Sequence, residues 1–262
     1  MDFAQRIRRM TGGHWLAVFG LILGAWVVLY AMSLPSDLRD MGRIYGAEFW
    51  VELCSVTPDA AGYFKVVLMW AAMSAAMMAP TFLPALTTYD DLTATQATTR
   101  RGFYELLGGY LVIWLGFSVF AAAAQMTLSA AGLVSPIGQS LSDWFSVVLL
   151  LVAGIYQFSP LKEACLSKCR MPLTFFMEHW SPTRWNAATM GLRLGLICLG
   201  CCWALMALAF VGGAMNLIWM GLATLIMVFE KLPEIGRYVT RPLGVALIGG
   251  AIVLAGQAIG LF

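Results

Sequence analysis

The feature that most constrains the fold is an uncharged stretch of 36 residues, 194–229. As one helix at ~1.5 Å per residue it would be about 54 Å long, whereas the hydrocarbon core of a bilayer is about 30 Å thick. Gly212 and Gly213 lie at the middle of the stretch, and glycine tolerates the backbone of a tight turn. We therefore predict two short membrane helices, 194–211 and 214–229, joined by a turn.

Five other apolar stretches are long enough to cross a bilayer, and the second is expected to close at Pro80 and Pro84. These stretches are 15–34, 66–83, 106–133, 144–161 and 242–262. No long polar loop separates them. The sequence therefore predicts an all-α polytopic membrane bundle of about seven transmembrane helices, forming a single domain over residues 1–262.

Composition excludes several other classes of protein. Apolar residues make up 60% of the chain and charged residues 11%, whereas soluble domains carry roughly 45–50% and about 25%. Aromatic residues make up 13%, which argues against disorder, and the net charge of +2 does not suggest nucleic-acid binding. The sequence contains no nucleotide-binding glycine loop and no catalytic motif of the soluble hydrolases or metalloproteases.

The distribution of Lys and Arg predicts the orientation of the helices. In the seven-helix arrangement, thirteen of the sixteen basic residues fall on the side of the N-terminus, and only Arg39, Arg43 and Lys65 fall on the other side. Cytoplasmic loops carry such an excess of basic residues. We expect a multi-pass protein of the bacterial inner membrane with its N-terminus inside and its C-terminus outside. The first apolar stretch is expected to remain as an uncleaved span.

Methionines form a regular stripe in the second apolar stretch. Met69, Met73 and Met77 recur every four residues, which places them on one face of a helix. The intervening residues are mostly Ala and Ser, which allow a second helix to approach closely. Thioethers suit a soft metal such as Cu(I), although methionine also serves as an apolar filler. Both interpretations remain open for this stripe taken alone.

Three cysteines are clustered within the predicted helix 194–211, the fifth span in chain order. Cys198 and Cys202 share a helical face, Met206 extends that face by one turn, and Cys201 points about a third of a turn away. Thiolates one turn apart can share a soft metal ion or take part in redox chemistry. Buried cysteines also serve simply as small apolar residues.

A second pair of cysteines follows the fourth apolar stretch. Cys165 and Cys169 share a face if this segment is helical, and basic residues flank them. On the predicted cytoplasmic side a stable disulfide is not expected, so the pair suits reduced metal binding or redox chemistry. A short interfacial helix whose basic residues meet lipid phosphates is the alternative. His179 is a weaker candidate ligand near this surface, and Arg193 is expected to pair with Glu230 at the ends of the hairpin.

Four sequence blocks stand out by their combination of residues. They are Trp70-x-x-Met73-x-x-x-Met77-Met78-x-Pro80, Tyr156-Gln157-Phe158-Ser159-Pro160-Leu161-Lys162-x-x-Cys165-Leu166-x-x-Cys169-Arg170-x-Pro172, Gly195-x-x-Cys198-x-Gly200-Cys201-Cys202-Trp203-x-Leu205-Met206 and Glu230-Lys231. Together they resemble an uncharacterised bacterial family of predicted metal-binding integral membrane proteins, over about residues 60–235. The resemblance implies metal binding in a membrane. It implies no particular substrate or reaction.

We interpret the chain as a membrane protein that binds a soft transition metal, with copper as the first choice and zinc as the second. The expected ligands lie between the second and fifth spans and at the cytoplasmic cysteine pair: Met73, Met77, Cys198, Cys201, Cys202, Met206, Cys165 and Cys169. A weak inverted echo between Trp70–Met77 and Trp203–Phe210 favours a shared site near the bilayer midplane.

The expected role is metal transport or delivery to a membrane metalloenzyme. The expected partners are the lipid bilayer and either a metalloprotein acceptor or other membrane subunits. Two alternatives remain open. One is a transmembrane thiol–disulfide electron carrier, and the other is a non-catalytic accessory subunit whose Cys and Met residues mostly pack. The sequence does not decide whether the protein is an enzyme.

Overall fold

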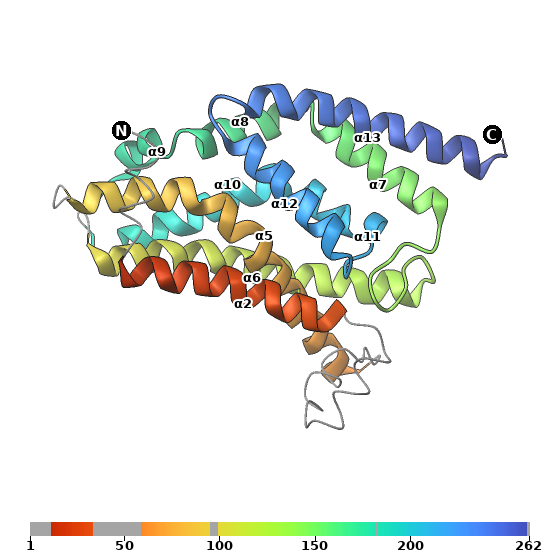
Figure 1. The fold of residues 1–262 in the computed structure, drawn as a ribbon, viewed down its shortest axis with the longest axis horizontal. Helices are drawn as coiled ribbons and strands as arrows, with labels where there is room; N and C mark the ends of the chain where they lie inside the picture. Colours follow the sequence, from red (N-terminus) through yellow and green to blue (C-terminus); the bar gives the residue numbers. More distant parts are fainter. Residues whose placement is uncertain (1–11, 34–58, 95–98, 182, 261–262) are drawn as a thin grey trace.

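The computed structural model describes residues 12–33, 59–94, 99–181 and 183–260. Helices dominate these residues, and no β-strand is found among them beyond one isolated bridge between Val134 and Ser140. The helices, labelled as in Figure 1, are α2 (Gly13–Ser33), α5 (Ala60–Ala94), α6 (Arg100–Ala130), α7 (Asp143–Tyr156), α8 (Pro160–Arg170), α9 (Pro172–His179), α10 (Asn186–Ala207), α11 (Ala209–Gly212), α12 (Leu217–Lys231) and α13 (Gly236–Ala258).

The all-α membrane architecture predicted from the sequence is confirmed. Within the described residues, five helical segments are long and apolar enough to cross a membrane: α2, α5, α6, α10 continued by α11, and α13. α7 and α8 meet at a bend of 63° and make a sixth candidate if the bent pair is one span. α12 has 15 residues and is shorter than a full span requires. The count of seven spans and the orientation stay predictions, and Arg39 and Arg43 lie outside the described residues.

The predicted break in the long uncharged stretch is confirmed. α11 ends at Gly212, and Gly213 has a φ of +88°, a backbone conformation that favours glycine. Asn216 then caps α12, because its side-chain oxygen accepts a hydrogen bond from the backbone N–H of Trp219 at 3.1 Å. The Trp219 indole N–H reaches back to the carbonyl of Leu208 at 3.0 Å and holds the turn closed.

The expected closure of the second span at its prolines is wrong. α5 continues through Pro80 and Pro84 as far as Ala94. Prolines are tolerated inside membrane helices where neighbouring groups bond to the backbone around them. Here the hydroxyls of Thr81 and Tyr110 both donate to the carbonyl of Met78, at 2.8 and 3.0 Å. The predicted start of the last span at Pro242 is wrong in the same way, because α13 begins six residues earlier, at Gly236.

The core is built around α10, which packs most extensively against α6. α5 lies beside α6, α2 lies along α5, and α13 covers α7 (Figure 1). Glycines allow the close approach of α6 and α10. A Cβ at Gly191 would collide with the carbonyl oxygen of Leu106, and one at Gly109 would collide with the carbonyl oxygen of Ala188. α10 is therefore fixed backbone to backbone against α6.

This contact predicts a large difference between two glycine variants. Gly191→Ala should lower the free energy of unfolding by about 1–3 kcal/mol, because its new methyl group meets backbone that cannot move aside cheaply. Gly116→Ala in α6 is the matched control, since nothing lies within 4 Å of its Cβ position. Unfolding in mixed micelles with increasing denaturant measures both variants. Equal stability of the two would contradict the close α6–α10 contact.

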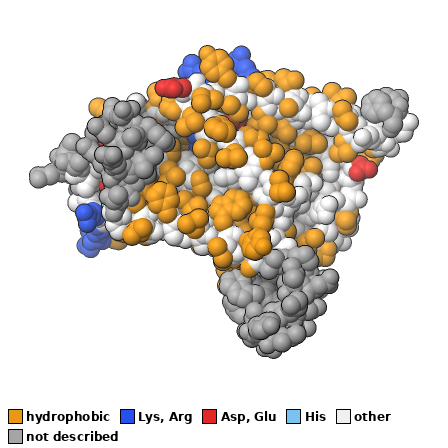
Figure 2. All heavy atoms as spheres, in the orientation of Figure 1, with side chains coloured by type: hydrophobic (Ala, Val, Ile, Leu, Met, Phe, Trp, Pro, Cys, Tyr) orange, Lys and Arg blue, Asp and Glu red, His pale blue; other side chains and the backbone are white. Residues whose placement is uncertain are grey.

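The surface agrees with a membrane environment. Figure 2 shows hydrophobic side chains spread over the middle of one face, with Lys, Arg, Asp and Glu near its margins. Many large apolar side chains are exposed, including Leu16, Phe120 and Ile218. A soluble monomer rarely exposes so much contiguous apolar surface, whereas lipid covers it in a membrane protein.

Candidate metal site

Three thiols of α10 meet in the interior of the bundle. The sulfur atoms of Cys198, Cys201 and Cys202 all lie within 4.8 Å of one another, and the three side chains are buried. The Sγ atoms of Cys201 and Cys202 are 3.3 Å apart, and the Cys201 thiol donates to the carbonyl of Cys198 at 3.1 Å. All three are free thiols. Cys201 thus joins the other two even though a regular helix turns it partly aside.

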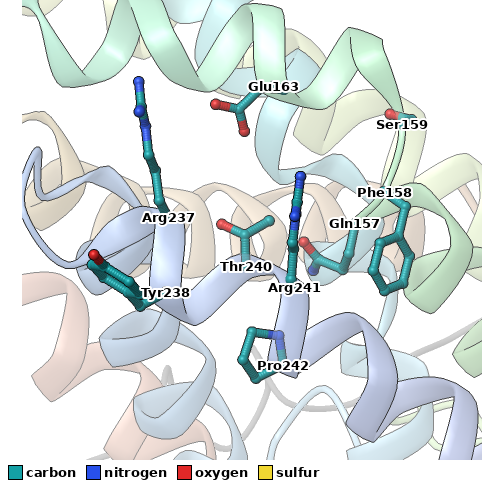
Figure 3. Close-up of a pocket in the computed structure, with 9 residues that line it drawn as sticks. All are labelled: Gln157, Phe158, Ser159, Glu163, Arg237, Tyr238, Thr240, Arg241 and Pro242. Atoms are coloured by element: carbon teal, nitrogen blue, oxygen red, sulfur yellow. The ribbon is translucent and has the colours of Figure 1, made fainter.

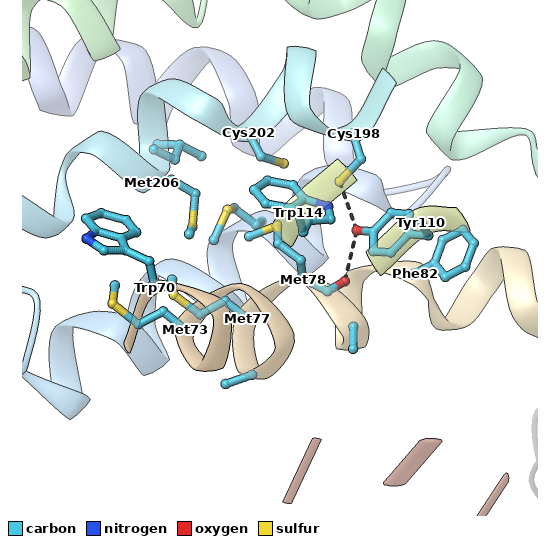
Figure 4. Packing of buried hydrophobic residues seen from close by; sticks show 14 of the residues in the cluster. Trp70, Met73, Met77, Met78, Phe82, Tyr110, Trp114, Cys198, Cys202 and Met206 are labelled. Carbon is cyan, nitrogen blue, oxygen red and sulfur yellow. Dashed lines mark hydrogen bonds between the residues drawn. The ribbon is translucent and has the colours of Figure 1, made fainter. Parts of the chain in front are cut away.

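Thioethers from two helices face the same interior. Figure 4 shows Met73 and Met77 of α5 opposite Cys202 and Met206 of α10. All of these side chains are buried, with exposed fractions of 2% or less. Helical spacing predicted a methionine face on one helix and a cysteine face on another, and the structure places the two faces opposite each other. Small residues between the methionines keep α5 close to its neighbours.

The second cysteine pair adjoins this cluster. α8 is helical, so Cys165 and Cys169 share a face as expected, and α8 packs against α10. The Cys165 sulfur fills the space beside Gly200, where a Cβ would lie 2.8 Å from it. The thiol of Cys169 lies next to that of Cys201. Both side chains are only partly buried, so this pair lies between the surface and the buried thiols.

A buried lysine, Lys231, completes the site, and it is not among the site residues predicted from the sequence. Lys231 ends α12, and its ammonium lies 2.9 Å from the sulfur of Cys198 and 2.7 Å from the hydroxyl of Thr81. The hydroxyl of Tyr110 is also within 3.0 Å of the Cys198 sulfur. A lysine is almost never fully buried without polar partners. In the sequence, the feature that points to Lys231 is that Glu230-Lys231 directly follows the long uncharged stretch.

The predicted pair between Arg193 and Glu230 is wrong. Glu230 instead pairs with Lys162 of α8 at 2.9 Å, and both side chains are almost completely buried. Arg170, which is also buried, donates from Nε to the backbone carbonyl of Glu230 at 2.9 Å. Arg193 is exposed instead. The reason is that α8 folds back against the end of α12. Lys162 and Arg170 were expected in a loop, but this packing turns their side chains into the interior.

The weaker histidine candidate does not reach the cluster. The Nδ1 atom of His179 lies 3.0 Å from the carbonyl of Phe175 within its own helix α9. The sixth cysteine, Cys54, lies outside the described residues. The cluster of thiols and thioethers therefore contains no histidine among the residues that the structure describes.

The donor set fits a soft metal ion. Thiolates and thioethers are the side chains that Cu(I) prefers, and here sulfur side chains of both kinds point toward one another in the core. The ammonium of Lys231 places a positive charge beside Cys198, which offsets the negative charge of metal-bound thiolates. The buried indole N–H of Trp114, which Figure 4 shows in the same cluster, has no hydrogen-bond partner among the described residues.

Comparisons with known proteins agree with this chemistry. A family described as PpoB2, copper chaperone, matches residues 67–254, which is more than two thirds of the chain. The match begins in α5 and ends in α13, so it includes the methionine stripe and both groups of cysteines. No match was found among curated proteins or among solved structures. The expectation of a metal-binding membrane family is confirmed, and the chain belongs to the PpoB2 copper chaperone family.

Proposed function

We propose that this protein takes up Cu(I) as its cargo within the bacterial inner membrane and delivers it to a metalloprotein acceptor. The cargo is bound by the thiols of Cys198, Cys201 and Cys202. The observation that carries the proposal is that these three buried sulfurs lie within 4.8 Å of one another and adjoin buried methionines. Residues 1–262 act as one domain, since the two donor faces belong to helices packed into a common core.

The choice of copper over zinc rests on the kind of ligand. Structural zinc sites are usually tetrahedral and built from Cys and His. Here the additional donors are the thioethers of Met73, Met77 and Met206, which suit Cu(I) better than Zn²⁺. No carboxylate or histidine joins the described cluster. Copper is therefore the proposed cargo.

The partly exposed pair on α8 supports a route for the ion. Cys165 packs beside Gly200, and Cys169 lies next to Cys201, so a thiol-bound ion can pass to the buried cluster through neighbouring sulfurs. On the predicted orientation, this pair receives the ion from the cytoplasmic side. Exchange between adjacent soft ligands keeps the ion bound throughout the transfer.

The route predicts a kinetic defect with little change in capacity. The Cys165→Ser/Cys169→Ser variant should acquire copper from a Cu(I)–glutathione donor about tenfold or more slowly, because the first accepting thiols are gone. Its final copper content should match that of the unaltered protein, since Cys198, Cys201 and Cys202 remain. A time course of copper transfer in detergent, quantified by mass spectrometry of the metal, measures both quantities.

The control is Cys54→Ser, which removes one thiol and none of the clustered ones. Unchanged loading rates in the Cys165/Cys169 variant would contradict the route but not the assignment of the buried site.

Thiol alkylation separates copper binding from the electron-carrier alternative. Bound Cu(I) should protect the cysteines from alkylation in reducing buffer. In a redox carrier, the extent of cysteine alkylation would instead depend only on the thiol–disulfide redox potential of the buffer.

A further inference from the structure

A cavity separate from the cysteines opens between the α7–α8 bend and the start of α13. Its volume is about 780 Å³. Figure 3 shows Arg237, Thr240 and Arg241 of α13 on one side, Glu163 of α8 on another, and Gln157 and Phe158 of the bend closing the end. None of these side chains belongs to the proposed copper site. The cavity therefore needs an account of its own.

The charges that line the cavity favour an anion. Arg237 and Arg241 are one turn apart on α13 and both extend along the cavity (Figure 3). Neither has an ion-pair partner among the described residues. The facing carboxylate of Glu163 is already engaged by Arg170 at 3.2 Å. Two guanidinium groups on one wall, neither paired within the described part of the chain, are suited to bidentate binding of a phosphate group.

The remaining lining is partly polar and partly apolar. Gln157 is 5% exposed, and its side-chain oxygen has no hydrogen-bond partner among the described residues. A hydroxyl or ammonium group of a bound molecule is the kind of donor that this oxygen lacks. Pro242 lines the same space, and Phe158 and Tyr238 are exposed beside it. Such a mixture suits a polar headgroup attached to an apolar chain.

We propose that this cavity binds a phosphate group, held by Arg237 and Arg241, and that the phosphate belongs to the headgroup of an anionic phospholipid. The apolar rim favours a lipid over a free phosphate ion. The two arginines fall on the side predicted to be cytoplasmic, where anionic lipids attract basic residues. This site is independent of copper binding.

Native mass spectrometry of the purified full chain tests the proposal. The protein is incubated with equal amounts of phosphatidylglycerol and phosphatidylcholine, and the retained lipid is counted. The unaltered protein should retain phosphatidylglycerol preferentially. Arg237→Gln/Arg241→Gln should retain at least about tenfold less, because two charge-assisted phosphate contacts are lost. Arg100→Gln/Arg101→Gln removes two exposed arginines elsewhere and should retain as much as the unaltered protein.

Equal retention of phosphatidylglycerol by the Arg237/Arg241 variant and the unaltered protein would overturn the proposal. The single variants Arg237→Gln and Arg241→Gln keep the test decisive if the double variant is poorly folded, since each should show an intermediate loss. Competition with millimolar inorganic phosphate identifies the source of the phosphate group. Displacement of the lipid would assign the cavity to free phosphate, and persistence of the lipid would assign it to the headgroup.

Discussion

Replacing Cys198 and Cys202 together with serine is expected to reduce the copper that co-purifies with the protein from about one ion per chain to less than about a tenth of that. Serine keeps nearly the same size but offers a hard oxygen donor that Cu(I) does not favour. The two sulfurs belong to a cluster in which all three lie within 4.8 Å of one another, so removing both leaves one cluster thiol, Cys201, with Cys169 beside it. The one cluster thiol that remains, together with the thioethers, should bind the ion much more weakly than three thiolates do.

The measurement is elemental mass spectrometry of protein purified in mild detergent under reducing conditions. Cys54→Ser is carried in parallel and should keep its copper. Size-exclusion chromatography and circular dichroism check that the double variant is folded, which is expected because Ser replaces Cys with little change in volume. Copper content unchanged in the folded double variant would refute the assignment of the site to these thiols.

The largest expected loss of stability belongs to Glu230. Glu230→Gln should lower the free energy of unfolding by about 3–5 kcal/mol, since it leaves the buried ammonium of Lys162 without its counter-charge. Glu105→Gln is the matched control. Glu105 also pairs with a basic residue, Arg101, at 2.8 Å, but that arginine is 62% exposed to the surroundings. Loss of this pair should cost less than about 1 kcal/mol.

Unfolding in mixed micelles with increasing denaturant measures both variants, and the difference between them is the decisive quantity. A second variant isolates the cause. Lys162→Met/Glu230→Leu removes both charges and should recover much of the stability lost in Glu230→Gln, because no unpaired buried charge remains. If Glu230→Gln and Glu105→Gln destabilise the protein equally, the buried pair does not hold α8 in place.

The sequence predicted those features that depend on local order along a helix. Apolar length located the membrane helices, and the spacing of Met73, Met77, Cys198 and Cys202 placed soft donors on defined faces. The ion pair between Arg101 and Glu105, one turn apart in α6 and 2.8 Å in length, is local in the same way. Such features follow from the geometry of one helix and need no knowledge of the tertiary fold.

The features that the sequence did not predict depend on contacts between distant helices. Lys162 and Glu230 are separated by 68 positions, and Lys231 and Thr81 by 150. Lys162 and Lys231 follow apolar stretches, where the sequence predicts exposed loop charges, but both are buried by helices from elsewhere in the chain. The end expected at Pro80 is wrong for a related reason, because the Tyr110 hydroxyl that bonds to the carbonyl of Met78 in α5 comes from the neighbouring helix α6.

The glycine contact between α6 and α10 has a consequence for the proposed release of copper. A Cβ at Gly109 or Gly191 would meet backbone of the facing helix, so α10, which carries the thiol cluster, packs backbone to backbone on α6. α8 is held differently, by the polar contacts of Lys162 and Arg170 with Glu230. If the protein delivers copper as proposed, the helix expected to move as the ion leaves is therefore α8 and not α10.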